Sequence, residues 1–524
     1  MPHHQMGRKL SIDDDDLDLI MSILLEQEKP LSTNELAEAL IQNKLQQETA
    51  LLENKFKDVV VYDPSRTYEI GQRLLFPALE YATAVIIDQR EGNNLDLGTF
   101  DVIRVEFEDG GQNSPDIREF ASNLSVAHKL NRDNDDDDLF AYPIETSSSK
   151  ELLTESFIQM LKNFLQKAPE LASVGEYWFL RDLILEVNIG HLNLAEASLA
   201  LAGGVPLDTA HILSDIGSLG DSSLELQLFS LNYHLKHDRR FDEVGPAGQI
   251  LWHLSEMQPN EVKQIPSELQ YAKIEYDRAL LSSEMLALEE EIADEYSPID
   301  TQTEIDQDAA TITLIYPHRR LGTFPLNQQT RQIFPKATTA SRIWITLIDK
   351  QDGEEFSGWV VPAGRYVYGL ERYYRKHRLP VGAYVSVARE NDNPGRIIVS
   401  FEAYPARIEW IRLISIQNTH LSFKNEKRAI GANYDDLMII GADDLERIDA
   451  LHRRVQDEKR TLFAIMKEIL PELGRLTPQG TVHAKTLYSA INILRRCPPG
   501  PILAILSANP EFQNMGGQYW KLTG

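Results

Sequence analysis

The chain has 524 residues, 42% of them hydrophobic and 25% charged, which excludes a globally disordered protein and predicts several folded domains. Its formal net charge of −28 argues against a general polyanion binder, because nucleic-acid binding depends on cationic contacts to phosphate. The single cysteine, Cys497, excludes an intrachain disulfide, and no apolar run approaches the ~20 residues of a membrane helix, so we expect a cytoplasmic protein without a membrane partner.

Charge is distributed unevenly along the chain. Residues 313–412 contain fifteen Lys or Arg and nine Asp or Glu, and residues 453–524 contain ten and five. These regions carry net charges of +6 and +5, which leaves −39 for the remainder. The asymmetry allows nucleic acid to contact two local basic modules although the whole chain is acidic.

Three acidic stretches interrupt the sequence, at Asp13–Asp16, Arg132–Asp138 and Leu288–Asp308. Dense like charges repel one another, so we interpret these stretches as solvated linkers. A calcium site is not expected in "DNDDDD", because this run lacks the central Gly and the distal Glu of a calcium loop.

The chain begins with a helical segment followed by a strand-rich one. Apolar residues recur at helical spacing up to Pro30, and Ser32 or Thr33 can cap a second helix, which predicts a helix-turn-helix-like module at residues 15–66. Residues 67–131 place β-branched and aromatic residues between turn signals such as "EGNN" and "EDGG". This pattern predicts a small β-rich, barrel-like module.

The rest of the chain alternates in the same way, so the predicted fold class is α+β and multidomain. A helical module ending in a hairpin is expected at residues 150–258, and a helix with an acidic linker at 259–310. A second β-rich, barrel-like module with a basic face is expected at 311–440, and a C-terminal helical module at 446–524.

Two of these modules end alike, with "RFDEVGPAGQILWHL" at residues 240–254 and "PEFQNMGGQYWKL" at residues 510–522. In each, a Phe precedes a Gly-containing turn and a strand that contains Trp and Leu. This order is typical of a β-hairpin packed on helices, since Gly permits the positive φ of a tight turn. Three helical segments precede each hairpin, so we predict that both modules are winged helices.

The last hairpin carries a packing expectation. Alternate side chains of a strand point to the same face, so Phe512, Trp520 and Leu522 are expected to be buried. We expect them to pack against Phe463 and Leu487 in a separate C-terminal domain.

The segments "NPEFQNMGGQYWKL", "DRRFDEVGPAGQILWHL" and "PLSTNELAEAL" resemble the HARE-HTH winged helix, a family found in the delta subunit of bacterial RNA polymerase and in restriction endonucleases. The resemblance implies winged-helix modules at the C-terminus, in the middle and at the N-terminus. The segment expected to be the third C-terminal helix, "PPGPILAILSA", departs from a DNA-reading helix because it contains no Arg or Lys.

The second β-rich module resembles the DNA-binding barrel of plant auxin response factors in "IFPKA" and in "LPVGAYVSV". That family has an Asp in the second motif where this chain has Ala383. The resemblance implies a small barrel that contacts DNA.

No pattern of catalytic residues emerges from the sequence. Cys497 lies in "RRCPPG" as a small buried or boundary residue, and His234 and His237 form a helical pair without a third metal ligand. The carboxylates in "YDD" at Tyr434–Asp436 are adjacent and do not share a face. No phosphate loop, nucleophile elbow or dinucleotide fingerprint is present, so we predict a protein that is not an enzyme and has no cofactor or metal.

Basic and aromatic residues in "GRYVYGLERYYRKHRLP" are the best candidates for nucleic-acid contact, because Lys and Arg neutralise phosphates and Tyr can stack on bases. The alternative is a solvated helix whose tyrosines pack inward. With the secondary candidates from two further basic segments, the predicted nucleic-acid-binding residues are Arg365, Arg372, Tyr373, Arg375, Lys376, Arg378, Lys424, Lys427, Arg428, Arg495 and Arg496.

These observations favour a DNA-associated or transcription-associated binding protein, with DNA as partner of the basic modules and protein partners at the acidic regions. One alternative is a protein-interaction scaffold whose winged helices bind proteins and not DNA. The other is an accessory subunit of a restriction or nuclease system.

Overall fold

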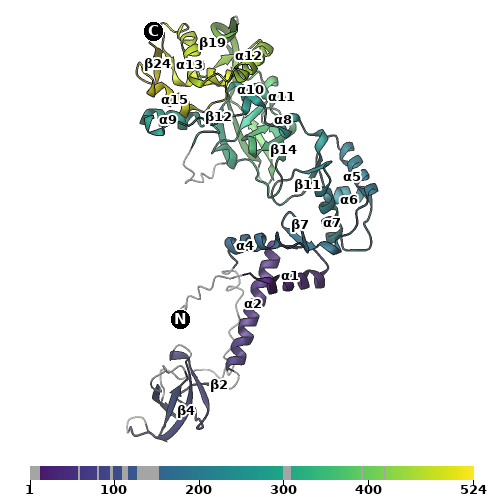
Figure 1. Cartoon of the computed structure of the whole chain (residues 1–524), viewed down its shortest axis with the longest axis vertical. Coiled ribbons are helices and arrows are strands. Elements are labelled where there is room, and N and C mark those ends of the chain that lie inside the picture. The colour runs from purple at the N-terminus through teal and green to yellow at the C-terminus, as the bar shows by residue number, and fades with distance from the viewer. Residues whose placement is uncertain are drawn as a thin grey trace. The chain divides into compact units, whose positions relative to one another are not determined.

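The computed structural model describes residues 12–56, 59–79, 82–94, 98–108, 116–126, 153–298, 308–390, 393–417 and 419–523. It divides into two compact units, Met1–Ile184 and Leu185–Gly524, which are described separately below (Figure 1). Both helices and sheets are present, in agreement with the predicted α+β class. No helix within the described ranges has the length and apolar character needed to cross a membrane.

Unit 1 contains a three-helix module with a small sheet. The helices are α1 (Asp14–Gln27), α2 (Thr33–Phe56) and α4 (Glu155–Leu165). The sheet has the strand order β1-β8-β7, with β1 at Leu31–Ser32, β7 at Leu171–Val174 and β8 at Tyr177–Leu180.

The first acidic stretch begins a helix and is not a linker. The Asp13 side chain accepts a hydrogen bond from the Asp16 backbone N–H, and the Asp16 side chain accepts one from the Asp13 N–H, so the two residues form a capping box for α1. Asp16 is buried and lies 2.8 Å from Lys44 Nζ. Carboxylates at this position also interact favourably with the helix dipole.

A five-stranded sheet lies between α2 and α4 in the sequence, in the predicted β-rich region. Its strand order is β2-β3-β4-β5-β6. The strands are β2 (Val59–Val61), β3 (Arg73–Phe76), β4 (Ala82–Glu91), β5 (Asp101–Phe107) and β6 (Ile117–Ser122). Stacked and edge-on rings of Tyr62, Phe76, Phe107 and Phe120 form its core. The acidic run Arg132–Asp138 lies outside the described residues.

Unit 2 begins with a second three-helix module. Its helices are α5 (Ile189–Leu201), α6 (Thr209–Ile216) and α7 (Leu224–His237). The strand order of its sheet is β10-β11-β9, with β9 at Leu207–Asp208, β10 at Phe241–Glu243 and β11 at Leu251–Leu254.

A third module of the same kind ends the chain. Its helices are α13 (Leu462–Gly474), α14 (Ala484–Leu494) and α15 (Pro499–Ala508). The strand order is β22-β24-β23, with β22 at Val482–His483, β23 at Phe512–Asn514 and β24 at Tyr519–Leu522.

The packing expected for the last hairpin is confirmed in part. Phe512 and Trp520 are buried, and the Phe512 ring lies edge-on to Phe463 with centroids 5.7 Å apart. Leu522 is only partly buried. The expected separate domain is wrong, because the same core continues through α9 (Ser283–Ile292) and a long hairpin upstream of the module.

The three modules share one order of elements and one register. Each runs helix, strand, helix, helix, strand, strand, and the first strand pairs with the last. The paired positions are Leu31 with Trp178, Leu207 with Trp252 and Val482 with Trp520. All three tryptophans are buried.

The order of elements revises the expected boundaries. In the N-terminal module the five-stranded sheet separates the second helix from the third, and β7 and β8 complete the module. The range predicted as one module, residues 150–258, therefore contains the end of the first module and all of the second. The boundary between the two units, at Ile184, falls inside that range.

A nearly closed, barrel-like sheet occupies the centre of unit 2, in the second β-rich region predicted. Its strand order is β12-β17-β18-β14-β15-β16-β13, and β14 and β18 are its parallel pair. The strands are β12 (Ala309–Thr313), β13 (Thr323–Pro325), β14 (Ile343–Asp349), β15 (Glu355–Val361), β16 (Tyr366–Tyr368), β17 (Tyr384–Glu390) and β18 (Asn393–Ser400).

Short helices and a long hairpin complete unit 2. The helices are α8 (Asn260–Lys263), α9, α10 (Tyr316–Leu321), α11 (Glu371–Lys376) and α12 (Leu445–Asp457). The hairpin consists of β19 (Ala403–Gln417) and β20 (His420–Ala432), and β21 (Ile440–Gly441) extends its sheet. Near the turn, Ile414, Leu421 and Phe423 join the core of the C-terminal module.

Candidate binding surfaces and a buried arginine network

The basic helix α11 is surrounded by carboxylates. Lys376 Nζ lies 2.8 Å from Asp349 Oδ2, 2.5 Å from Asp352 Oδ2 and 2.9 Å from Glu354 Oε2. Hydrogen bonds to these three acids raise the pKa of Lys376 above its ordinary value. The ammonium group is therefore already neutralised within the chain.

The arginines of this segment are partly matched in the same way. Arg372 lies 2.5 Å from Glu354, and Arg375 pairs with Glu371 one turn earlier. Arg378 is exposed and has no carboxylate partner among the residues described. Most of the positive charge that made this helix a nucleic-acid candidate is thus offset locally.

Tyr373 is part of the hydrophobic core of the barrel-like sheet. Its side chain is 2% exposed and lies in the barrel core, with ring contacts to Phe356 and His377. The inward packing that was the alternative interpretation is therefore observed, and the placement of Tyr373 does not support a direct contact with bases.

The hairpin places the secondary candidates on two faces. Lys424 and Arg428 both pair with Glu426, at 2.8 and 2.7 Å, and Arg428 also pairs with Asp443. Lys427 projects from the other face, where its Nζ lies 5.1 Å from the centroid of the Trp410 ring. Lys427 is therefore the hairpin candidate that is stacked on an aromatic side chain and not paired with an acid in the described structure.

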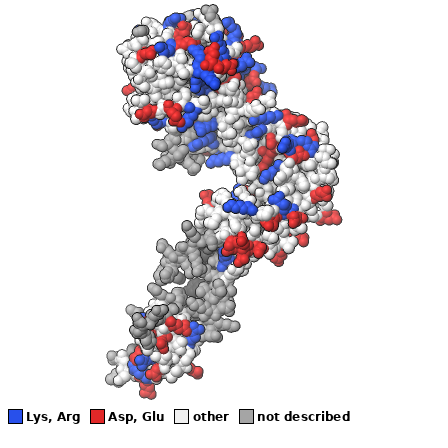
Figure 2. Space-filling view, viewed as in Figure 1, with Lys and Arg blue, Asp and Glu red and all other residues white. Residues whose placement is uncertain are grey.

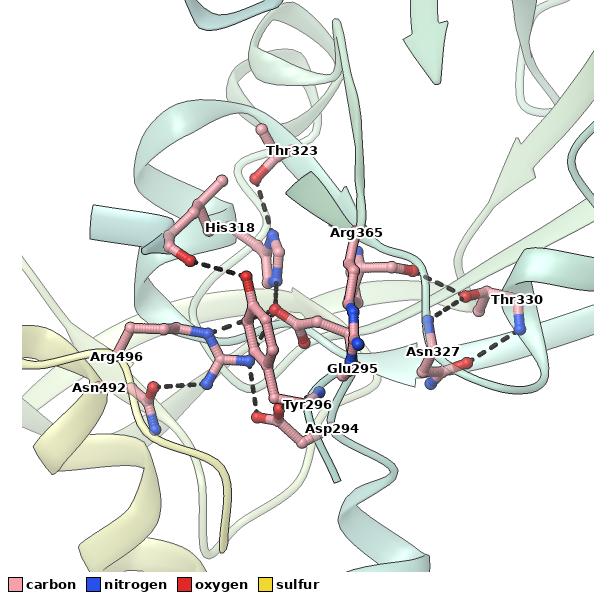
Figure 3. Close-up of polar contacts among 12 residues, drawn as sticks. Asp294, Glu295, Tyr296, His318, Thr323, Asn327, Thr330, Arg365, Asn492 and Arg496 are labelled. Atoms are coloured by element: carbon pink, nitrogen blue, oxygen red, sulfur yellow. Dashed lines mark hydrogen bonds and ion pairs between the residues drawn. The ribbon is translucent and has the colours of Figure 1, made fainter. Parts of the chain in front are cut away.

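Arg496 is fully buried, contrary to its predicted role at a nucleic-acid surface. Its Nη2 lies 2.7 Å from Asp294 Oδ2 and 2.6 Å from Glu295 Oε1, and its Nη1 donates to Asn492 Oδ1 at 2.9 Å (Figure 3). The neighbouring Arg495 donates to the backbone carbonyl of Arg460. A buried guanidinium with these partners cannot reach a phosphate.

Burial and charge set the ionisation of this network. Burial raises the pKa of Asp294, although Arg496 opposes the effect. Burial acts in the same direction on Glu295, but Arg496 and a hydrogen bond with His318 hold the pKa of this carboxyl well below its usual range. The pair raises the pKa of Arg496 in spite of its burial, which keeps the guanidinium charged.

The network also corrects the expected role of the third acidic stretch. Asp294 and Glu295 come from the region predicted to be a solvated linker, yet both are buried, as is Glu289. They join the segment after α9 to α14 and to α10, which carries His318 (Figure 3). The ion network therefore fastens the C-terminal module to the barrel side of unit 2.

A pocket of about 520 Å³ opens beside this network. The Tyr296 ring lies between two guanidinium groups, 5.1 Å from Arg496 and 5.2 Å from Arg365. Arg365 also donates to the backbone carbonyl of Glu295 at 2.8 Å. Arg331 lines the same pocket and is exposed. The predicted site residue Arg365 lines this pocket.

The middle module carries an uncharged apolar stripe on α5. Ile189, Leu194 and Leu201 are 67%, 51% and 88% exposed, and Ala197, Ala200 and one polar residue, Asn193, lie between them on the exposed side. On the face of the molecule drawn in Figure 2, Lys and Arg are interspersed with Asp and Glu. Single exposed apolar side chains are common on protein surfaces, whereas a contiguous exposed apolar patch indicates an interaction site.

Other candidate chemistry does not assemble into a site. His234 and His237 contact separate backbone carbonyls, of Leu185 and Tyr233. Within the described ranges, no group of three His, Cys, Asp or Glu is placed to hold a metal. The carboxyl of Asp435 binds the buried Lys485, and Cys497 is buried, with its pKa raised to about 12 by burial.

Comparison with known protein families, with curated proteins and with solved structures finds no match to this chain. The function proposed below is therefore inferred from the burial, contacts and charges of the chain's own residues.

Sequence reasoning missed the α5 stripe and the first module's tryptophan. The signal for the latter was present: "YWFL" at residues 177–180 matches "LWHL" and "YWKL" of the other two hairpins. The α5 stripe was concealed because apolar residues occur on both the core side and the exposed side of this helix, which leaves little amphipathic contrast between them.

Proposed function

We propose that this chain is a protein-interaction scaffold built on three winged-helix modules, and that α5 of the middle module is its main docking surface. The observation that carries the proposal is the uncharged stripe around Leu201 on α5, with Ile189 and Leu194 also exposed. This proposal adopts the scaffold alternative in place of DNA association through the winged helices.

The winged-helix assignment rests on order and register. Three helices followed by a two-stranded hairpin, with a short strand after the first helix pairing with the hairpin, occur three times in the chain. This arrangement supports the resemblance to HARE-HTH modules that the sequence motifs suggest.

The third helices favour protein over DNA. In many winged helices this element enters the major groove of DNA. Here α15 is almost wholly buried and contains no Lys or Arg, whereas α4 and α7 each contain a single Lys, in the last turn, at Lys162 and Lys236. Such surfaces offer few contacts to phosphate, which supplies much of the affinity for DNA.

Comparison of two equivalent helices supports the role of α5. In the C-terminal module the first helix, α13, packs against β20, where Ser422 Oγ donates to Glu472 and His420 lies 3.2 Å from Glu468. Its outer side is thus covered by the chain itself. The first helix of the middle module, α5, leaves Ile189, Leu194 and Leu201 exposed, so burial of its stripe requires a partner protein.

The proposal is tested by comparing the proteins that co-purify with the full chain and with a Leu194→Asp, Leu201→Asp double variant. Charge on the stripe should remove at least one stoichiometric partner, because burying an unpaired carboxylate is strongly unfavourable. Leu224→Asp is the matched control, since Leu224 is a 59% exposed leucine on α7 of the same module. Identical partners for all three proteins would refute the docking role of α5.

A role in DNA association remains the second candidate, favoured by the two basic regions of unit 2. Its original centre, α11, is neutralised by carboxylates, so binding of duplex DNA by a fragment of residues 313–524 would have to come from elsewhere. The hairpin formed by β19 and β20 carries Lys427 without an acidic partner among the described residues, and its properties point to a different nucleic-acid ligand.

A further inference from the structure

The hairpin β19–β20 carries an exposed aromatic platform. Ile408 and Trp410 are 66% and 64% exposed and point to the same face of β19. Their cross-strand partners are Ala429 and Lys427. On this half of the hairpin the face is open, whereas nearer the turn the same face is covered by the C-terminal module.

Trp410 differs from the other tryptophans of the chain. All six lie among the described residues; Trp344 is half-buried, and Trp178, Trp252, Trp359 and Trp520 are buried. Exposing an indole in water forgoes a large burial energy, so a solvated Trp on a regular strand is expected to have a ligand. Lys427 lies over the ring, yet most of the indole remains accessible.

The local charge identifies the ligand as anionic. The strands β19 and β20 together contain five Lys or Arg and two Glu, a net charge of +3 in a chain of −28. Two of these cations stack on aromatic rings and have no acidic partner in the part of the chain described: Lys427 over Trp410, and Arg407 over Tyr404 with 5.5 Å to the centroid. Arg407 is three residues from Trp410 along β19, so it projects from the opposite face of the hairpin and Lys427 is the cation on the Trp410 face.

From these residues we propose that the hairpin binds single-stranded nucleic acid, with one base stacked on Trp410 and a flanking phosphate contacting Lys427. A single strand exposes the flat faces of its bases, which duplex DNA hides within its stack. Stacking on aromatic side chains combined with cationic contacts to phosphate is a general means of binding single strands with little sequence preference. The apolar Ile408 beside the indole extends the platform for the base.

The test uses the full chain and the fluorescence of its one exposed tryptophan. Titration with a 20-nucleotide oligothymidylate at low salt should quench part of the emission, because the base stacks on Trp410. Trp410→Ala should weaken binding, measured by anisotropy of labelled oligonucleotide, by roughly 5- to 150-fold, the range for one stacked base. Lys427→Glu should also weaken it and flatten the salt dependence, whose log–log slope is expected to be about −0.7 for this one phosphate contact.

Two controls separate stacking from simple charge attraction. An abasic strand of equal length retains the phosphates and should bind more weakly by about the factor lost in Trp410→Ala. Tyr519→Ala, which removes another exposed aromatic residue of unit 2, should leave binding unchanged. The proposal is overturned if the oligothymidylate fails to bind at low salt, if Trp410→Ala binds like the unmodified chain, or if the abasic strand or a duplex binds as tightly.

Discussion

At Arg496, one guanidinium group balances two buried carboxylates whose sequence positions lie about two hundred residues away. Removing one partner of a buried ion network leaves uncompensated charge in a medium that solvates it poorly. Arg496→Ala should therefore destabilise unit 2 by about 3–5 kcal/mol, measured by urea denaturation.

The matched control for this change is Arg331→Ala. Arg331 lines the adjoining pocket but is exposed, so its removal should change the free energy of unfolding by less than about 0.5 kcal/mol. Equal effects of the two substitutions would contradict the structural role assigned to Arg496.

The reactivity of the adjacent Cys497 thiol reports whether this region is buried. Burial raises the pKa of its thiol to about 12, so almost none of the reactive thiolate is present at pH 8. The native chain should show no thiol that reacts with a disulfide reagent within minutes, and one thiol per chain after denaturation. Rapid stoichiometric reaction of the native protein would show that this core is open.

At the scale of single elements, sequence pattern predicted local structure well where a short motif carries a geometric requirement. The C-terminal hairpin was found because Gly516 and Gly517 mark its turn and Phe512 and Trp520 occupy its inward positions. Both glycines have positive φ, as a tight turn requires. The motif therefore predicts both the position of the turn and the side chains that are buried in the core.

Elements assembled from distant segments were not predictable in this way. The third helix and the hairpin of the N-terminal module were missed because a whole sheet is inserted between its second and third helices, so Leu31 and Trp178 pair across 147 positions. Asp294 and Glu295 were interpreted as solvated because their acidic neighbours dominate the local composition, while their partner Arg496 lies far along the chain. The density of charge along a segment predicts its average exposure to solvent, but it does not reveal an ion pair with a distant residue that allows one carboxylate to be buried.

The tryptophan in the last strand of each module should dominate the stability of its hairpin. Trp520→Ala should cost roughly 3–5 kcal/mol, because a large buried side chain is replaced by a cavity. The loss should appear as a lower denaturation midpoint for the C-terminal half of unit 2. Tyr519→Ala, at a 40% exposed neighbour, should have little effect; a comparable loss at both positions would contradict the inward placement of Trp520.

At the scale of the whole molecule, ion pairing within the chain decides how many basic side chains are available to a ligand. Many of the basic side chains of α11 and the C-terminal module are paired with acids in the structure, and Lys376 and Arg496 are examples with several partners. The net charge of the regions 313–412 and 453–524 therefore overstates the cations available to a ligand. Two surfaces of the described structure have the features of binding sites: the apolar stripe on α5 and the face of the hairpin that carries Trp410 and Lys427.

The chemistry of the two surfaces suits them to different ligands. The α5 stripe lacks charge and suits the apolar face of a protein, whereas the hairpin presents Trp410 with Lys427 and suits a stacked base beside phosphate. Each surface can be altered without touching a buried residue, so the two activities can be tested separately in one full-length protein.

The central claim, that α5 is a protein-docking surface, is tested most directly by site-specific photo-crosslinking in cells that produce the protein. A photoreactive phenylalanine analogue replaces Leu201 in one variant and Leu224 in another, and products are separated by mass. The account predicts a discrete covalent protein adduct at position 201 that is absent at position 224, and loss of that adduct when Leu194→Asp is added. No adduct at position 201, or the same set of adducts at both positions, would contradict it.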